Sequence, residues 1–204
     1  MGYTHYWYRK QNLDLYKFKR LAEDFKKLLP VFSRLGIKLA GGLGTGEPRI
    51  NQEEIWFNGD RNCGHVKRDL GIAWPSKNAY GVSQFTQIQK NHLADSDVSG
   101  QWFAGLQLNT RTCDGDCSHE TFHLPLKYPK KGGWDTPKNG KYFDFCKTAY
   151  KPYDLPVICA LIIAKHFFGS QIRVNSDGTE ENWIDGKLIC DRILGYGNDF
   201  KLDR

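Results

Sequence analysis

KPYDLPVICALIIAKHFFG, residues 151–169, is the most strongly helical stretch of the chain and decides the fold class. Pro152 suits the first turn of a helix, and Gly169 ends the apolar pattern. The apolar side chains between them recur at helical spacing along one stripe, and with one histidine they are Leu155, Ile158, Cys159, Ile162, Ile163, His166 and Phe167. We therefore expect a helix packed against a sheet.

Two further helices flank this one in the sequence. Asp14 is the expected N-cap of an amphipathic helix near the N-terminus. Pro30 lies inside that pattern, so we expect it to kink the helix or divide it into two pieces. A last helix, capped by Asp177 or Thr179, ends at Gly195.

The remaining ordered segments show strand patterns, bounded by residues that favour turns. The expected strands cover residues 2–9, 37–40, 53–60, 101–108, 119–126, 142–149 and 171–178. Residues 60–99 lack periodicity and are expected to form an irregular insertion, and 128–141 are expected to be a loop. The order of these elements thus predicts that residues 1–204 form a single α+β domain. In it we expect a mixed β-sheet with amphipathic helices packed mainly on one face. An open opposite face bearing aromatic and polar residues would be a natural binding floor.

Composition sets broad limits on partners and location. The chain has 204 residues, of which 40% are hydrophobic and 14% aromatic, and a net charge of +6. This charge favours a phosphate-bearing partner, although the basic residues are scattered rather than gathered in a stripe. No apolar run approaches the roughly 18 residues of a membrane span, and no signal-peptide pattern opens the chain. We expect a cytoplasmic protein with no membrane partner.

CDGDCSHETFH, residues 113–123, concentrates potential metal ligands. Cys113 and Cys117 have the spacing of a zinc knuckle, and a third ligand could come from His119 or His123. Cys63 or His65, in the CGH stretch, could be the fourth. The zinc set that we carry forward is therefore Cys63, Cys113, Cys117 and His119. The alternatives are a hairpin tip with free thiols, a disulfide closing the 113–117 loop, and a divalent-cation site at Asp114 and Asp116.

FCKTAYKPYD, residues 145–154, joins a strand to the central helix. An anion bound there would meet the positive end of a helix, the hydroxyl of Thr148, and the ammonium groups of Lys147 and Lys151. Asp154 falls in the first turn, where the helix dipole also favours its charge. The alternative is a well-capped helix with solvated lysines.

Several motifs together resemble a group of phage and bacterial proteins of uncharacterised activity. These are GYTHYW at 2–7, NGD at 58–60, HETF at 119–122, FDFCKTAYKPYD at 143–154 and SDG at 176–178. That group carries an FxFCKTxRKPYD-like segment, so Tyr150 replaces an expected arginine, and the Cys113 and Cys117 pair lies outside its pattern. The resemblance implies a phage or bacterial setting and directs attention to His5, Asp60, Lys147, Thr148, Lys151, Asp154, Ser176 and Asp177.

Three functions follow as hypotheses. The first is binding of an anionic small molecule, such as a nucleotide, near residues 147–154. The second is a hydrolase-type enzyme that uses His5 with Asp60 or Asp177. The third is an inhibitor or accessory protein that binds a host protein through aromatic side chains. Nucleic acid binding ranks after these three.

Overall fold

The computed structural model describes residues 3–65, 68–71, 102–103, 106–107, 110–113, 115–129 and 136–203. Its helices are α1 (Leu15–Arg34), α3 (Asp154–Phe168) and α4 (Ile184–Leu194), with 3₁₀ turns at Gly42–Gly44, Gly169–Gln171 and Glu180–Trp183. Its strands are β1 (Thr4–Arg9), β2 (Leu39–Ala40), β3 (Arg49–Ile50), β4 (Glu54–Gly59), β5 (Arg68–Gly71), β6 (Trp102–Phe103), β7 (Leu106–Gln107), β8 (Thr110–Cys113), β9 (Phe122–Pro125), β10 (Tyr142–Lys147) and β11 (Ile172–Ser176).

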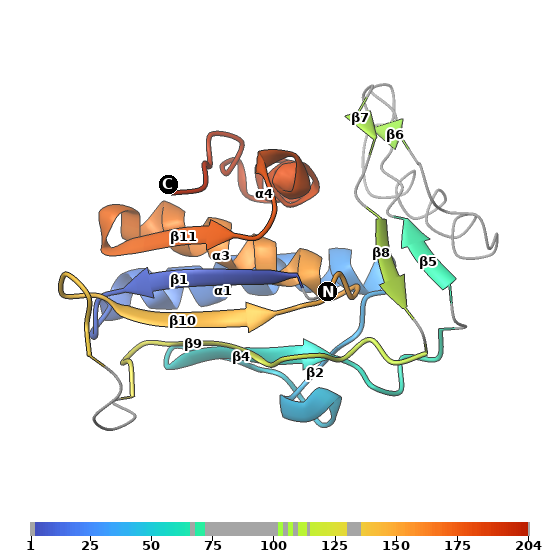
Figure 1. Cartoon of the computed structure of the whole chain (residues 1–204), viewed down its shortest axis with the longest axis horizontal. Coiled ribbons are helices and arrows are strands. Elements are labelled where there is room, and N and C mark those ends of the chain that lie inside the picture. The colour runs from blue at the N-terminus through green and yellow to red at the C-terminus, as the bar shows by residue number, and fades with distance from the viewer. Residues whose placement is uncertain are drawn as a thin grey trace.

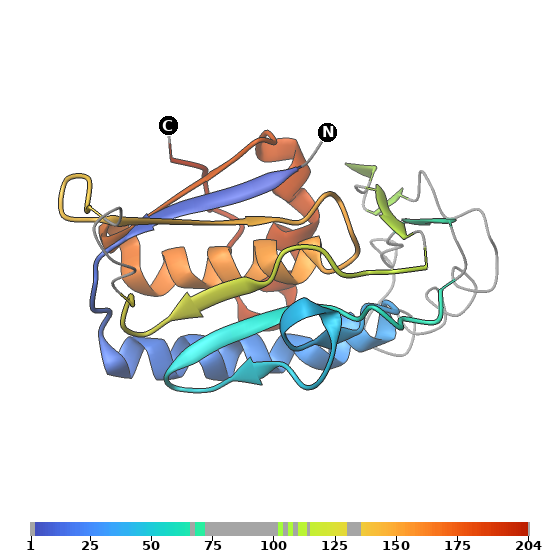
Figure 2. The same cartoon turned by 60° about the horizontal axis from the view of Figure 1, so that its bottom comes forward.

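The first and last parts of the chain share one sheet. Strand β1 lies between β10 and β11 and is antiparallel to both. Strand β4 pairs with β2, β3 and β9, also antiparallel. In Figure 1 the strands β11, β1, β10, β9 and β4 lie side by side as one layer, with α1 and α3 behind them. Figure 2 shows α3 beneath β1 and β10. The α+β class is confirmed, but the strand pairs of the described residues are antiparallel rather than mixed.

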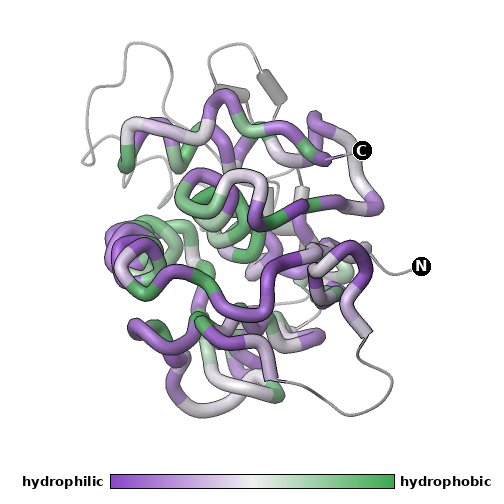
Figure 3. Tube along the Cα trace, turned by 90° about the vertical axis from the view of Figure 1, so that its left-hand side faces the viewer, coloured by the Kyte–Doolittle hydropathy of each residue, from purple (hydrophilic) through white to green (hydrophobic). Residues whose placement is uncertain are grey.

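Helix α3 forms the centre of the core. Its residues from Asp154 to Ala164 are all buried, because α1 and α4 pack against it and the sheet covers a third side. Trp7 of β1 and Trp183 before α4 are fully buried beside it. Figure 3 shows hydrophobic residues gathered toward the interior and hydrophilic ones along the outside. The inner faces of the strands are thereby held against a rigid layer of helices.

Helix α1 follows the sequence prediction with one correction. The side chain of Asp14 accepts a hydrogen bond from the amide of Lys17 at 2.8 Å, as expected of an N-cap. Pro30 does not divide the helix, which continues to Arg34. Proline removes only one backbone donor, and the buried stripe on both sides of Pro30 packs against the core. Tertiary packing thus offsets the local cost.

Other segments differ from their predicted form. Residues 101–108, expected as one strand, contain the two short paired strands β6 and β7. Within the expected loop 128–141, Lys138 and Lys141 pair across a tight turn. Of the expected insertion 60–99, residues 68–71 form β5, and 72–99 lie outside the described residues. Among the helices that the structure describes, none is long and apolar enough to cross a membrane.

The cap before α4 comes from Thr179. It precedes the turn Glu180–Trp183, and its amide donates to the side-chain oxygen of Asn182 at 2.8 Å. Asp177, the other candidate, instead accepts a hydrogen bond from the amide of Thr4 at 3.0 Å. Asp177 therefore fastens the end of β11 to β1 rather than starting the helix.

Candidate functional site

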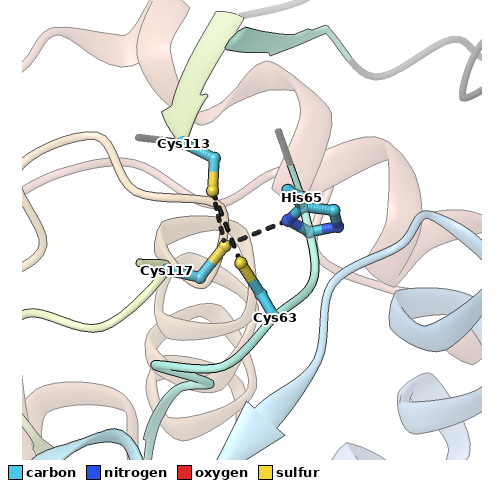
Figure 4. A group of neighbouring side chains, drawn as sticks. All are labelled: Cys63, His65, Cys113 and Cys117. Atoms are coloured by element: carbon cyan, nitrogen blue, oxygen red, sulfur yellow. Dashed lines mark hydrogen bonds between the residues drawn. The ribbon is translucent and has the colours of Figure 1, made fainter. Parts of the chain in front are cut away.

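A cluster of three cysteines and one histidine forms beside the end of β4. The Sγ atoms of Cys63, Cys113 and Cys117 and one ring nitrogen of His65 all lie within 4.8 Å of one another. In Figure 4 the four side chains point toward a common centre from three separate stretches of chain. The three thiols are buried, and His65 is partly exposed. These four residues could hold a metal ion.

The distances within this Cys–His cluster are short. The Sγ atoms of Cys63 and Cys113 are 3.6 Å apart, and those of Cys113 and Cys117 are 3.2 Å apart. Nδ1 of His65 lies 3.2 Å from Sγ of Cys117. A disulfide requires a sulfur–sulfur separation of about 2.05 Å, so the expected alternative of a 113–117 disulfide is not formed. All three cysteines are free thiols.

Backbone geometry brings the four ligands together. Gly64, between Cys63 and His65, has a φ of +77°, and Gly115, between the other two cysteines, has a φ of +94°. Both values lie in the region that glycine tolerates best, so each glycine reverses the chain and turns two ligands toward one point. The amide of Cys117 also donates to the carbonyl of Asp60 at 3.2 Å, which fixes the second ligand pair against the first.

Histidine 119 is not part of the cluster, which corrects the predicted ligand set. Its Nδ1 lies 2.7 Å from the carbonyl oxygen of Lys147 and is engaged there. His65 supplies the fourth donor instead, since the glycine between it and Cys63 allows both side chains to face one centre. Asp116, a candidate cation ligand, accepts hydrogen bonds from the amide and hydroxyl of Ser118. Asp114 lies outside the described residues.

The environment of the cluster disfavours charged thiols unless a cation is present. Burial raises the pKa of Cys117, and the thiols of Cys113 and Cys63 beside it raise it further. Burial likewise raises the pKa of Cys113 above its usual range. Among the described residues, three cysteines and one histidine supply the four donors, a set typical of structural metal sites.

A second polar group lies in the core beneath the central sheet. His5 of β1 contacts Asp154 at the start of α3, with 2.7 Å between Nε2 and Oδ1. The hydroxyl of Thr148 donates to the same Oδ1 at 2.5 Å. The other ring nitrogen of His5, Nδ1, lies 3.0 Å from Oγ of Ser176. The structure therefore unites four of the residues that the sequence singled out: His5, Thr148, Asp154 and Ser176.

Arg111 of β8 completes this buried network. Its Nε donates to Oδ2 of Asp154 at 3.0 Å, and its Nη1 to Oδ2 of Asp185 in α4 at 2.5 Å. Arg111 and Asp154 are each 1% exposed and Asp185 is fully buried. One guanidinium thus pairs with two carboxylates and links β8 to two helices. Sequence reasoning missed Arg111 and Asp185, because neither carries a local motif.

The charges of the buried network depend on one another. Burial raises the pKa of Asp154, but His5, Arg111 and the hydroxyl of Thr148 together lower it to about 2. Burial lowers the pKa of Arg111, whereas the carboxylates of Asp185 and Asp154 raise it above its usual range. Ion pairs of this kind are costly to bury and very costly to break. Ser176, His5 and Asp154 have the connectivity of a serine–histidine–aspartate triad, and His5 is fully buried.

The remaining predicted residues lie apart. The carboxylate of Asp60 accepts from the amide of Asn62 at 2.8 Å, and Asp177 holds the amide of Thr4. The carboxylate bonded to His5 is thus that of Asp154, and not that of Asp60 or Asp177. Lys151 donates to the carbonyl of Asp116 at 2.8 Å. Lys147 is partly exposed at the end of β10.

The outer face of the central sheet is hollowed and basic. A cavity of about 490 Å³ opens there, over β1 and β11 and beside the turn before β10. Three of its seven lining residues are cationic and none is acidic; the lining comprises Tyr6, Tyr8, Lys138, Asn139, Lys141, Arg173 and Asn175. Its volume falls in the range of small-molecule sites, about 300–1,000 Å³. None of these residues was among the predicted site residues.

No protein-family model, curated protein or solved structure matches this chain.

Proposed function

We propose that the protein is a zinc protein in which Cys63, His65, Cys113 and Cys117 form a structural centre. The observation that carries this proposal is the convergence of all four donor atoms within 4.8 Å. The three buried thiols gain little from one another, because a thiol is a weak donor and a weak acceptor. A bound metal supplies the missing stabilisation.

The donor chemistry favours zinc. Thiolate and imidazole are soft and intermediate ligands, and a Cys₃His set is one of the common structural zinc sites. Tetrahedral zinc with sulfur bonds of about 2.3 Å would place two sulfur atoms about 3.8 Å apart. The separations of 3.6 Å for Cys63 with Cys113 and 3.2 Å for Cys113 with Cys117 are close to that value. Only a small outward movement of Cys117 is needed.

The proposed role of the metal is to hold together the two ends of the segment that separates Cys63 and His65 from Cys113 and Cys117. Cys63 and Cys113 are 50 residues apart in the sequence, and joining them closes a long loop. Cys113 ends β8, two residues after Arg111, whose guanidinium enters the core between two carboxylates. A metal at the cluster would hold β8 in register for that insertion. Metal binding would then contribute directly to folding free energy.

Zinc content of the purified full chain tests this proposal. We expect about one zinc per chain, retained after dialysis, and loss of that zinc in Cys63→Ser and His65→Ala. Cys146→Ser is the matched control, because Cys146 is a buried thiol whose partner is the carbonyl of Glu120 rather than the cluster. Equal zinc content in the cluster variants and the control would overturn the proposal, as would failure of the chain to take up zinc after refolding with it.

A second candidate function is the binding of an anionic ligand such as a nucleotide. The net charge of +6 and the basic lining of the cavity on the outer sheet face support it. The sequence predicts this anion site at the turn of residues 147–154. There, however, Thr148 and Asp154 hydrogen-bond to each other within the buried network. Thermal denaturation with millimolar AMP, ATP and inorganic triphosphate tests this function. A ligand that binds only the folded state raises the melting temperature, and an unchanged melting temperature with all three would contradict it.

A further inference from the structure

We propose that the outer face of the β10–β1–β11 sheet binds single-stranded nucleic acid, with bases stacked on its aromatic rings and phosphates held by the basic residues at its end. This inference deepens the proposed binding of an anionic ligand and rests on it. It does not depend on the zinc proposal. We call this surface the aromatic face; its residues are Tyr6, Tyr8, Phe143, Phe145, Arg173 and Asn175.

Strand register arranges the aromatic face as a grid. Tyr8 lies opposite Phe143 on one side and Arg173 on the other. Tyr6 lies opposite Phe145 and Asn175 in the same manner. Because side chains alternate along a strand, these positions share the outer face. Two neighbouring rows thus each contain two aromatic side chains and one polar side chain.

The two phenylalanine rings of the aromatic face are exposed to an unusual degree, and Tyr6 and Tyr8 beside them are half-buried. Phe143 is 44% exposed and Phe145 48% exposed, although phenylalanine is among the residues most often buried. The ring centroids of Tyr8 and Phe143 are 5.2 Å apart, and those of Phe143 and Phe145 are 5.8 Å apart. Figure 1 looks onto this side of the sheet, and α1 and α3 lie behind it. Each ring therefore offers a flat apolar surface, which suits an unpaired base.

Cationic side chains border the aromatic face at one end. Asn139 and Gly140 have φ values of +52° and +71°, which define a tight two-residue turn between Lys138 and Lys141. That turn fixes both lysines beside Tyr8 and Arg173, where they line the cavity of about 490 Å³. Partial burial lowers the pKa of Lys141, and the nearby positive charges of Arg173 and Lys165 lower it further. A phosphate placed among these cations would relieve their mutual repulsion.

The inner side of the same strands makes the platform rigid. Trp7, Cys146 and Val174 face the helices and are fully buried, so the strands cannot shift without disturbing the core. Preorganisation of this kind lowers the entropic cost of binding. Stacking needs bases whose faces are free, and duplexes hide those faces. A surface that binds another protein commonly offers both acidic and basic side chains at its rim. The residues that line this cavity include no carboxylate. Single strands therefore fit the chemistry best.

Fluorescence anisotropy with end-labelled ten-nucleotide oligothymidylate and oligouridylate, titrated with the full chain in excess zinc, tests the inference. We expect binding that weakens with salt, with a slope of log K against log salt of about −2 for three phosphate contacts. Phe143→Ala should weaken binding about fivefold or more, because stacking on one ring is lost. Lys141→Ala should reduce the slope by about 0.7. Comparison of the two oligonucleotides shows whether the sugar matters.

Two control variants share the chemistry but not the location. Tyr16 and Lys19 are exposed on α1, so Tyr16→Ala and Lys19→Ala should leave affinity and salt slope unchanged. Equal effects of Phe143→Ala and Tyr16→Ala would overturn the inference. If AMP or triphosphate stabilises the protein but oligonucleotides bind no more tightly than AMP, the inference fails while the anionic-ligand proposal stands. If neither class binds, both fail. A face occupied by a second copy of the chain would appear as a dimer in sedimentation, and Phe143→Ala would abolish it; that result also overturns the inference.

Discussion

Replacing Arg111 with methionine gives the sharpest test of the buried network. Methionine preserves much of the side-chain volume but removes the guanidinium that pairs with Asp154 and Asp185. Asp154 keeps His5 and Thr148 as partners. The described partners of Asp185, by contrast, are reduced to the amide of Gly186, which donates to its Oδ1 at 2.8 Å. The variant therefore leaves at least one buried carboxylate without a counter-charge.

The expected cost follows from that loss. Breaking a buried ion pair from one side costs about 3–5 kcal/mol, because the remaining charge stays desolvated. Arg111 is 1% exposed, so solvent does not screen its ion pairs and does not reduce this energetic cost. We expect Arg111→Met to lower the free energy of unfolding by about 4 kcal/mol. For a chain of this size each 1 kcal/mol corresponds to roughly 2–4 °C, so the melting temperature should fall by about 8–16 °C.

Urea unfolding followed by tryptophan fluorescence, at neutral pH with zinc present, measures this cost. Asp185→Asn and the double variant complete a mutant cycle. Asp185→Asn removes one of the two carboxylates, so we expect Arg111→Met to cost about 1–3 kcal/mol less in that background. Additive costs, or a loss below about 1 kcal/mol for Arg111→Met, would refute the reasoning. Zinc content of each variant shows whether β8 has also released the metal.

Three further outcomes are expected. The pKa of Asp154 is lowered to about 2 in the folded state, so the stability that its ionised carboxylate contributes is present above about pH 4 and is lost as the pH falls toward 2. Unfolding measured across that pH range should show a loss of roughly 2 kcal/mol in the free energy of unfolding, and Asp154→Asn should lack that loss. Gly59→Ala would place a Cβ against the carbonyl oxygen of Cys117, so urea unfolding should show a loss of about 3 kcal/mol. Gly140→Ala, where only backbone strain is added, should lose about 1 kcal/mol. Similar losses would contradict the close contact. Removal of the metal with EDTA should lower the melting temperature measured by calorimetry by about 8–16 °C, and added zinc should restore it. An unchanged melting temperature would show that the metal does not contribute to stability.

The elements that local patterns specify could be predicted from the sequence. The stripe after Pro152 and the N-cap at Asp14 identify α3 and α1, because helical spacing and capping are local properties. Alternation likewise identifies β1 and β11. The continuity of α1 through Pro30 could not be read this way, because it depends on packing against elements far along the chain.

The candidate sites were harder to predict because their members are far apart in the sequence. His5 and Asp154 are separated by 149 residues, and Arg111 and Asp185 by 74. A spacing rule identified three of the four cluster ligands but named His119 in place of His65, because the turn at Gly64 is not evident from spacing. The Asn139–Gly140 dipeptide was a usable signal for a tight turn, and it would have drawn attention to the lysines on either side.

X-ray absorption at the zinc edge, on the full chain purified with its metal, tests the central claim most directly. The proposed centre predicts three sulfur neighbours at about 2.3 Å and one nitrogen neighbour at about 2.0 Å. His65→Cys should convert the signal to four sulfur neighbours, because residue 65 supplies the only nitrogen donor in the described cluster. A first shell of oxygen and nitrogen alone, or a spectrum unchanged by His65→Cys, would contradict the account.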